Sequence, residues 1–422
     1  MSKKERIILL LLAALNFTHI MDFMIMMPLG NYLMPYFQIS SQQFSMLVAA
    51  YTFSAGASGF LAAFFVDRFD RKRILLFGYI GFLVGTLFCG LAPTYVFLLC
   101  SRIVAGLFGG LIAAQVLSIV ADLIPYERRG QAMGWIMAAF SVASVFGVPF
   151  GLYVANHFNW HGPFVFVAGM GAFLVPLIIR YLPKMDAHLH TNNGKIHPVE
   201  LVKGISKNNN QLLALSLSAC LMMGHFMIIP FLNPFMEFNM GFSKSQTPMI
   251  YMVGGALTLV SSPLLGRLAD VIGKHRLFII LVVLAVAPIA LITNLPKIPF
   301  YAVLSITGFW FIVSAGRSIP AQAMISNVVP PERRGSFMSF NSSVQQVFVG
   351  LASVLAGMIV VKTPDNKILH YELTGYISIS IILFSIVIAA MLHTKLKKND
   401  RILPEYQQEI EQEEIKKGEL VS

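Results

Sequence analysis

Twelve apolar stretches, each long enough to cross a lipid bilayer, account for most of this sequence. A transmembrane helix needs about 20 consecutive apolar residues, because the hydrocarbon core is about 30 Å thick and a helix rises about 1.5 Å per residue. The bilayer core offers no water, so each stretch has to satisfy its own backbone hydrogen bonds as a helix. The sequence therefore predicts an all-α membrane protein. The twelve stretches are residues 7–34, 43–66, 74–92, 96–122, 132–155, 162–183, 211–236, 246–268, 276–294, 299–325, 336–361 and 373–393.

Composition excludes a soluble globular protein. Charged residues make up 12% of the chain and hydrophobic residues 56%, with a mean hydropathy of +0.71, whereas soluble domains average about 25% charged residues. The net charge of +11 does not indicate nucleic-acid binding, because the basic residues gather in alternate loops and near both ends of the chain. This is the positive-inside distribution. It predicts a multi-pass protein of the plasma membrane, a bacterial inner membrane, with both termini in the cytoplasm.

The chain reads as a duplicated six-span unit. Leu-Ile-Pro-Tyr-Glu-Arg-Arg-Gly at 123–130 returns as Val-Val-Pro-Pro-Glu-Arg-Arg-Gly at 328–335, and Pro28 returns as Pro230 at nearly the same separation. Two such halves usually place a substrate site between them, near the middle of the membrane. The predicted parts are an N-terminal bundle over 1–183, a cytoplasmic linker over 184–210, a C-terminal bundle over 211–393 and a cytoplasmic tail over 394–422.

Asp22 and Arg102 are opposite charges inside the first and fourth apolar stretches. An ionisable side chain in the bilayer core costs about 2.5–3.5 kcal/mol on insertion scales, so it usually faces a bundle interior or a wet cavity. The helical rise puts both at a similar depth, and Gly106 and Gly109 on the Arg102 face let another helix approach.

We predict that Asp22 carries a coupling proton, which is bound when the Asp22–Arg102 pair separates and released when the pair forms. The alternative is a permanent salt bridge that fixes helix register. His19, on the Asp22 face, completes the predicted proton-coupling group, with an ordinary helix contact as its alternative.

Other polar residues inside the apolar stretches are candidates for lining a substrate cavity. Buried amides and charges need partners, and a wet cavity supplies them as well as helix contacts do. Arg317 can attract an anionic substrate or pair with a carboxylate; the alternatives are an inner-gate salt bridge or a side chain that reaches the interface. His225 follows Gly224, the second-half position that corresponds to Asp22. The predicted cavity set is Gln115, His225, Asn233, Arg317, Gln322, Asn341 and Gln345.

Three motifs carry a family resemblance. Gly266-Arg-Leu-Ala-Asp-Val-Ile-Gly-Lys-His-Arg276 is similar to the loop signature G-x-x-x-D-R-x-G-R-R of the major facilitator superfamily. Arg102-Ile-Val-Ala-Gly106 resembles its R-x-x-x-G motif. Gly147-Val-Pro-Phe-Gly151 resembles the G-P-x-x-G-G element of antiporters, with the proline and the second glycine displaced. The chain thus resembles the twelve-span drug:H⁺ antiporter branch, which includes bacterial sugar-efflux and multidrug permeases.

The resemblance implies two pseudo-symmetric six-helix bundles that rock around a central cavity. It also implies roles for two sets of residues. A conformational latch is implied for Asp67, Arg68, Arg71, Glu127, Arg128, Asp270, Arg276, Glu332 and Arg333. Hinge or packing roles are implied for Gly106, Gly109, Gly147, Pro149 and Gly151. For the basic residues of the latch, the alternative is charge that only sets topology.

The predicted function is secondary active transport, namely proton-coupled efflux of a small organic molecule, such as a drug-like compound or a sugar, by alternating access. The sequence shows no phosphate-binding loop, no Cys/His metal spacing and no clustered catalytic set. It therefore predicts neither an enzyme nor a bound cofactor, with a proton gradient as the energy source. The expected partners are the substrate and the lipid bilayer, and the expected state is a monomer. The alternatives are proton-coupled uptake of a nutrient or metabolite and, from another class, a non-transporting membrane receptor.

Overall fold

The computed structural model describes residues 3–65, 69–124, 128–186, 198–329 and 331–419. Within them, twelve helical segments are long and apolar enough to cross a membrane, which confirms the all-α, twelve-span prediction. The first-half elements are α1 (Lys3–Met26), α2 (Gly30–Tyr36), α3 (Ser41–Phe65), α4 (Arg71–Gly90), α5 (Tyr95–Leu123), α6 (Arg129–Val142), η3 (Ala143–Gly147), α7 (Val148–His157) and α8 (Gly162–Tyr181). Those that follow are α9 (Pro198–Lys207), α10 (Asn209–Phe226), α11 (Ile229–Phe238), α12 (Thr247–Ile272), α13 (Lys274–Thr293), α14 (Phe300–Ser326), α15 (Pro331–Ile359), β1 (Val361–Lys362), β2 (Ile368–Leu369) and α16 (Tyr371–Glu419).

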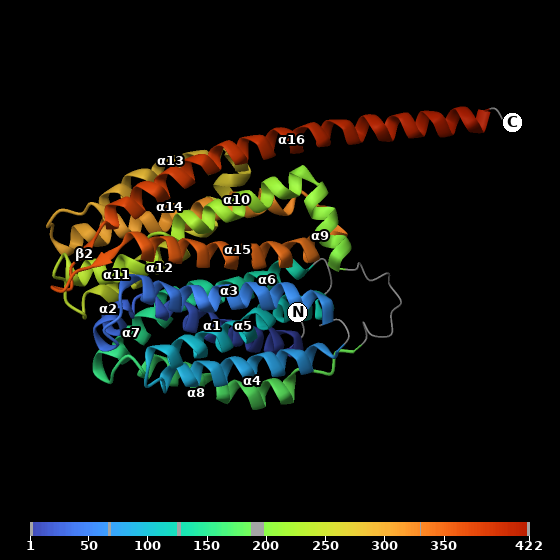
Figure 1. Cartoon of the computed structure of the whole chain (residues 1–422). Helices are drawn as coiled ribbons and strands as arrows, with labels where there is room; N and C mark the ends of the chain where they lie inside the picture. Colours follow the sequence, from blue (N-terminus) through green and yellow to red (C-terminus); the bar gives the residue numbers. More distant parts are fainter. Residues whose placement is uncertain (1–2, 66–68, 125–127, 187–197, 330, 420–422) are drawn as a thin grey trace.

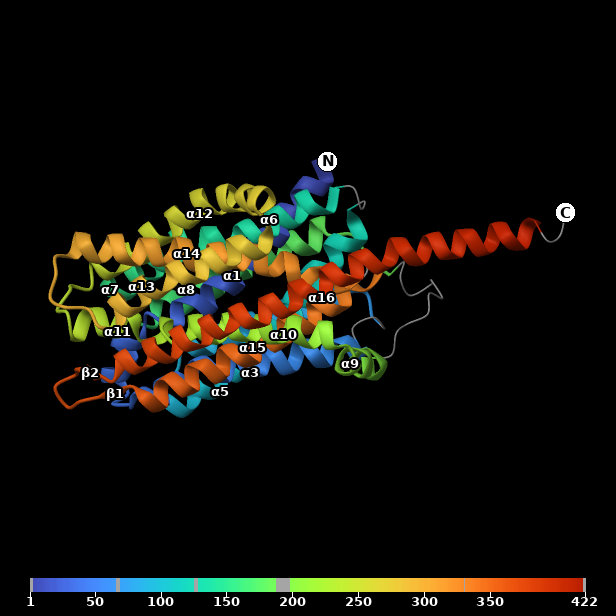
Figure 2. The ribbon, with the colours of Figure 1, turned by 90° about the horizontal axis from the view of Figure 1, so that it is seen from above.

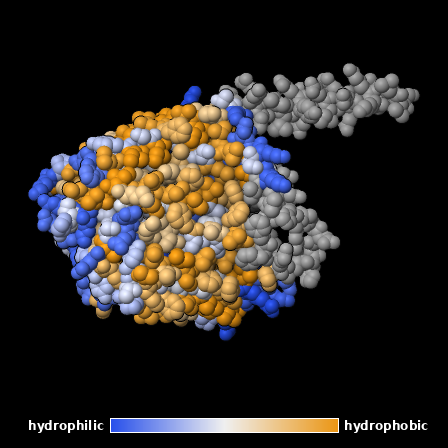
Figure 3. Space-filling view, in the orientation of Figure 1, coloured by the Kyte–Doolittle hydropathy of each residue, from blue (hydrophilic) through white to orange (hydrophobic). Residues whose placement is uncertain are grey.

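The helices form two halves that lie side by side along one long axis (Figure 1). We call the end of the bundle that carries α2, α11 and the β1–β2 hairpin the outer end, and the opposite end the inner end. Both chain termini lie at the inner end in two perpendicular views (Figures 1 and 2), as an even number of spans requires. The surface seen in Figure 3 is hydrophobic along its middle and hydrophilic toward both ends, which is the pattern of a protein surrounded by lipid.

Helix α16 is longer than the sequence predicted. It leaves the bundle at the inner end and continues as one helix to Glu419 (Figure 1), so most of the expected tail, 394–422, is helical. The predicted linker, 184–210, likewise contains a helix, α9.

Two spans are broken at corresponding places. The first is divided into α1 and α2 around Pro28, and the seventh into α10 and α11 just before Pro230. Proline lacks the backbone N–H that an uninterrupted helix needs and clashes with the preceding turn. Each break therefore separates a short helix at the outer end, α2 or α11, from the longer helix that precedes it.

The fifth span contains a π-helical turn. Segment η3 separates α6 from α7, and Pro149 stands in the first turn of α7. A proline after a regular helix removes one hydrogen bond, and a wider turn accommodates this loss. A Cβ atom added to Gly151 would lie 2.6 Å from Cδ1 of Ile25, and one added to Gly147 would lie 3.3 Å from Cγ of Met21. The two glycines therefore let α1 pack closely against the fifth span.

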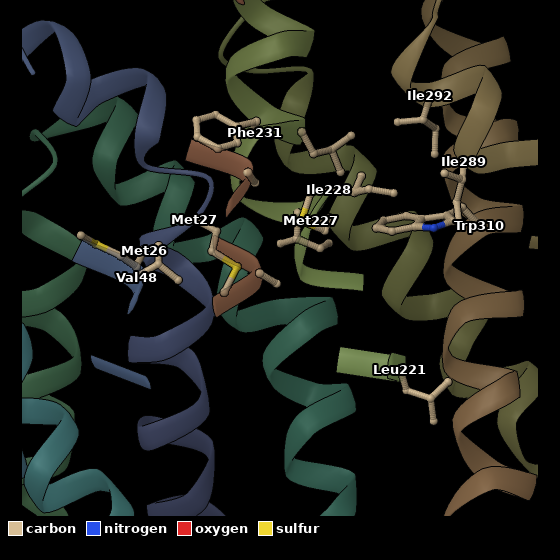
Figure 4. Packing of buried hydrophobic residues seen from close by; sticks show 14 of the residues in the cluster. Met26, Met27, Val48, Leu221, Met227, Ile228, Phe231, Ile289, Ile292 and Trp310 are labelled. Atoms are coloured by element: carbon tan, nitrogen blue, oxygen red, sulfur yellow. The ribbon is translucent and has the colours of Figure 1, made fainter. Parts of the chain in front are cut away.

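The halves meet along helices α3 and α15 and along α12 with η3 and α7. At the first of these seams, a Cβ atom added to Gly56 would lie 3.1 Å from the backbone oxygen of Ser343. The main apolar core also joins the halves. Figure 4 shows Met26 and Met27 of the first half near Met227 and Phe231 of the second, all buried.

Candidate functional site

Asp22 and Arg102 form a direct ion pair in the first half. Nη1 of Arg102, on α5, donates to Oδ2 of Asp22, on α1, at 2.8 Å, and both side chains have no exposed surface. The Arg102 guanidinium also lies over the Tyr51 ring, 4.3 Å from its centroid. Separating such a buried pair leaves an uncompensated charge, which typically costs 3–5 kcal/mol, on the order of a large core mutation. The pair can therefore separate only if something neutralises or solvates each partner.

His19 and the two glycines of α5 complete the surroundings of this pair. The His19 ring lies 5.5 Å from the Phe82 ring, edge to face, and both of its nitrogens are buried without a hydrogen-bond partner among the described residues. A Cβ atom on Gly109 would lie 2.8 Å from Nε2 of His19, and one on Gly106 would lie 2.3 Å from the Tyr51 carbonyl oxygen. The missing side chains thus let α1 and α3 close around Arg102.

The second half has a buried arginine, but its described residues form no such pair. Arg317, on α14, is 1% exposed and makes no ion pair or hydrogen bond with any described residue. His225, on α10, stacks on Trp310 with a centroid distance of 5.1 Å and an interplanar angle of 19°. At the position that corresponds to Asp22, Gly224 packs against α16: a Cβ atom there would lie 2.4 Å from Cγ2 of Ile382. The two halves therefore differ in charge at their centres.

A polar network joins the halves at the outer end. Nδ2 of Asn233, on α11, donates to the Pro28 carbonyl at 2.8 Å and to Oδ1 of Asn31, on α2, at 3.3 Å. Asn31 and Thr247 both donate to the carboxylate of Glu237, Thr247 at 2.7 Å. Asn233 thus contacts the first half at this end. We call Asn31, Asn233, Glu237 and Thr247 the outer network.

A second cross-half contact lies beside the outer network. Nδ2 of Asn156 donates to the Lys244 carbonyl at 2.8 Å, and the Lys244 ammonium lies 4.3 Å from the Tyr32 ring centroid. The Tyr32 hydroxyl donates a hydrogen bond to Oδ1 of Asn156, so Tyr32, Asn156 and Lys244 join the two halves.

The sequence reasoning missed Glu237, Asn31 and Tyr51. The seventh span was expected to end at residue 236, which left Glu237 just outside it, whereas α11 continues to Phe238. One signal was available for Asn31: it follows Pro28 by three positions, as Asn233 follows Pro230. Tyr51 looked like any aromatic residue in an apolar stretch, so nothing in the sequence marked its contact with Arg102.

The remaining predicted cavity residues are dispersed. Gln115 on α5 is fully buried, and neither atom of its amide has a hydrogen-bond partner among the described residues. On α15, Oδ1 of Asn341 and Nε2 of Gln345 are also buried without a hydrogen-bond partner among the described residues. Gln322 on α14 is half-buried. The described contacts do not bring these four amides together.

The predicted latch is seen only in part. Arg71 pairs with Asp122, and Nη1 of Arg128 pairs with Oε2 of Glu5 at 3.3 Å, so both pairs stay within the first half. Asp270 and Arg276 are exposed, and neither makes an ion pair with a described residue. Asp67, Arg68 and Glu127, and the side chains of Glu332 and Arg333, lie outside what the structure describes.

Comparison with known proteins identifies the family of this chain. The Major Facilitator Superfamily profile matches residues 12–319 and 215–418. The MFS-type transporter YwfA of Bacillus subtilis (strain 168) is 25% identical over 336 residues, covering 79% of each chain. Multidrug resistance protein 3 of the same organism is 33% identical over 149 residues, 35% of this chain and 29% of that protein.

Solved structures share the fold. A bacterial homolog of the human lysosomal transporter Spinster, in an inward-facing and unoccupied conformation, superposes with a TM-score of 0.74 at 15% identity, covering 94% of this chain and 98% of that one. A D-xylose-proton symporter superposes with a TM-score of 0.72 at 17% identity, covering 90% and 96%. Twelve spans, two halves and the profile match lead to one assignment: the chain belongs to the Major Facilitator Superfamily, a family of multi-pass secondary transporters rather than of enzymes.

Proposed function

We propose that this protein exports a small organic molecule from the cytoplasm in exchange for protons. The observation that carries the proposal is the fully buried ion pair between Asp22 and Arg102 in the first half, which has no counterpart among the described residues of the second half. The corresponding position in the second half is Gly224, which has no ionisable group. Protons would then be handled by the first half, leaving the second half to hold the substrate.

The physical basis is the cost of an unpaired buried charge. With the pair formed, Asp22 is an ionised carboxylate that is compensated by Arg102. When the halves rearrange and the pair separates in a water-poor site, the carboxylate takes up a proton rather than remain charged. Each cycle of pairing and separation therefore moves a proton. No bound cofactor enters this scheme, because the proton gradient supplies the energy.

Two further observations support the proposed direction of transport. The motif at Gly147–Gly151 resembles an element of antiporters, and a relative over about a third of this chain is a multidrug resistance protein. We also propose that the inner end faces the cytoplasm, because the basic residues outside the spans gather there, as the positive-inside rule describes. A protein with this orientation can take its substrate from the cytoplasm.

The test uses everted membrane vesicles that contain the transporter and carry an acidic lumen, with a fluorescent reporter of the pH gradient. A panel of anionic, neutral and cationic aromatic compounds is added outside, on the former cytoplasmic face. An antiporter exchanges its substrate for lumenal protons, so at least one compound should dissipate the gradient with the wild type. Asp22→Asn should give no response, and Asp22→Glu should retain part of it.

The matched control is Glu372→Gln, which neutralises an exposed acid at the outer end of α16 and should behave as the wild type. Each variant is used only if it elutes as a single folded species. A response of Asp22→Asn equal to that of the wild type would contradict proton coupling through this residue. Substrate-driven acidification of the lumen, instead of its loss, would identify an uptake symporter.

A further inference from the structure

The two arginines inside the membrane differ in one respect that points to the substrate. Arg102 and Arg317 are both almost completely buried, at 0% and 1% exposure, but among the described residues a carboxylate pairs with Arg102 and none pairs with Arg317. Nη1 of Arg317 is buried without any hydrogen bond to a described residue. An isolated charge in an apolar interior is costly. A protein normally retains such a charge where a ligand of opposite sign compensates it.

The helix that carries Arg317 presents further unpaired donors on the same face. Trp310, Ser314 and Arg317 are spaced by four and three residues, which places them one above another on α14. The indole Nε1 of Trp310 and the hydroxyl of Ser314 are also buried without a hydrogen-bond partner among the described residues. Indole and guanidinium groups only donate hydrogen bonds, and a hydroxyl can donate one. The described residues supply no carboxylate to this face.

His225 connects this face to the boundary between the halves. Its ring stacks on Trp310, at 5.1 Å, and meets Phe226 edge to face, at 5.3 Å. Phe226 in turn lies 5.9 Å from Phe23 of the first half, and Phe23 stacks on Tyr51 at 5.7 Å. Tyr51 is the ring that lies under the Arg102 guanidinium. A continuous row of aromatic contacts thus runs from the Arg102 guanidinium to Trp310, which precedes Arg317 by seven residues on α14.

We infer that Trp310, Ser314 and Arg317 form a subsite for an oxyanion, and that the transported molecule is an organic anion bearing a carboxylate, sulfonate or phosphate. This inference rests on the proposed function only in taking the bound molecule to be the exported one. Guanidinium groups bind such oxyanions by paired, charge-assisted hydrogen bonds. A cationic substrate would face an unpaired arginine, and a neutral one would leave its charge uncompensated. His225, which stacks on Trp310, is half-buried. We therefore place the entrance to the subsite on the side of His225.

The row of aromatic contacts also suggests how the subsite acts on the proton pair. If anion binding beside Trp310 displaces His225 and α10, the ring of Phe226 carries that displacement to Phe23 and then to Tyr51. The contact of Tyr51 with Arg102 is then the point at which substrate binding affects the pairing of Asp22.

Equilibrium binding to purified protein in detergent tests the subsite. Three probes of similar size and different charge are compared: benzenesulfonate, benzenesulfonamide and benzyltrimethylammonium. Benzenesulfonate should raise the midpoint of thermal unfolding of the wild type and bind at least about tenfold more tightly than the other two, as expected for hydrogen bonds to a charged group. Arg317→Met should lose at least this tenfold preference, and Arg317→Lys should keep part of it.

Two further variants keep the result interpretable. Ser314→Ala removes one donor with almost no change in volume and should weaken benzenesulfonate binding several-fold. Arg180→Met, at an exposed site on α8, is the matched control and should bind as the wild type does. Arg317→Met should also unfold at a higher temperature than the wild type when no ligand is present, because it removes an unpaired buried charge.

The inference is wrong if the wild type binds benzenesulfonamide as tightly as benzenesulfonate, if it binds neither, or if Arg317→Met keeps the preference for the anion. These measurements need no pH gradient, so they separate the inference from the proposed function. Anion binding without proton-driven export contradicts the proposed function alone. Export of only neutral or cationic compounds, with no anion binding, contradicts the inference alone.

Discussion

At the scale of single residues, the two buried arginines differ in whether another residue compensates their charge. The Arg102 guanidinium is compensated by Asp22 at 2.8 Å, whereas that of Arg317 has no partner among the described residues. Burying a compensated pair is roughly neutral for stability, whereas leaving one member alone is strongly unfavourable. The sequence predicted that both arginines face the interior, because a charge cannot face lipid cheaply. It also predicted that Arg102 pairs with Asp22, and it left open whether Arg317 pairs with a carboxylate.

A double-mutant cycle measures the coupling of the pair. Asp22→Asn and Arg102→Met should each lower the free energy of unfolding by about 3–5 kcal/mol, because each leaves one group uncompensated. The double variant should lose clearly less than the sum of the two, since no lone charge remains. The measurement is denaturant unfolding of the detergent-solubilised protein. Additive single effects would show that the two side chains do not compensate each other in the native state.

At the scale of the elements, the helices pack according to where small residues allow contact. The apolar stretches are hydrophobic on nearly all sides, so their sequence periodicity does not say which face is buried. Gly106 and Gly109 were predicted to allow a close approach, and the structure shows which helices use it: α3 and α1. The breaks at Pro28 and Pro230 were visible in the sequence as a repeated proline. The π-helical turn η3 was not predicted, although Pro149, which removes one backbone hydrogen bond beside it, is visible in the sequence.

Substituting the glycines of α5 tests the close approach. In Gly106→Ala the new methyl group would lie 2.3 Å from the Tyr51 carbonyl oxygen, so α3 has to move away from α5. We expect a lower midpoint of thermal unfolding and loss of proton-coupled transport. Gly169→Ala, on α8, is the control: no atom lies within 4 Å of its added carbon. That change should be neutral or stabilising by about 0.5–1 kcal/mol. Equal behaviour of the two variants would show that the α3–α5 approach is unimportant.

At the scale of the whole molecule, the structure holds the two halves together at the outer end. Asn31 and Asn233 occupy corresponding positions in the duplicated unit and hydrogen-bond to each other across the boundary. Glu237 accepts hydrogen bonds from Asn31 and Thr247 and thereby fixes both sides of the contact. In the transport cycle proposed above, the hydrogen bonds of this outer network have to break when the outer end opens.

Replacing Glu237 should favour that opening. In Glu237→Gln an amide nitrogen takes the place of one acceptor oxygen, so Asn31 and Thr247 compete for the oxygen that remains. We expect faster maleimide labelling of a cysteine introduced at Ser45, which is buried where α3 meets α15 at Gly357. Exposed Cys100 is first replaced by serine to remove background labelling. The control is Glu372→Gln, and an unchanged labelling rate in Glu237→Gln would show that the network does not hold the outer end closed.

The sequence by itself determined the number of spans, the duplication and the presence of costly charges inside the membrane. These follow from local physics: a stretch of about 20 apolar residues has to be a helix in lipid, and a charge within it has to face away from lipid. The pairing of Asp22 with Arg102 was expected from their similar depth, and the structure shows the direct contact. The tertiary structure alone decided how the other polar groups are partnered. Asn31 reaches Asn233, and Arg317 reaches no carboxylate among the described residues. Those outcomes depend on how each helix is rotated against its neighbours. In helices that are apolar on every side, that rotation is set by packing and not by hydropathy.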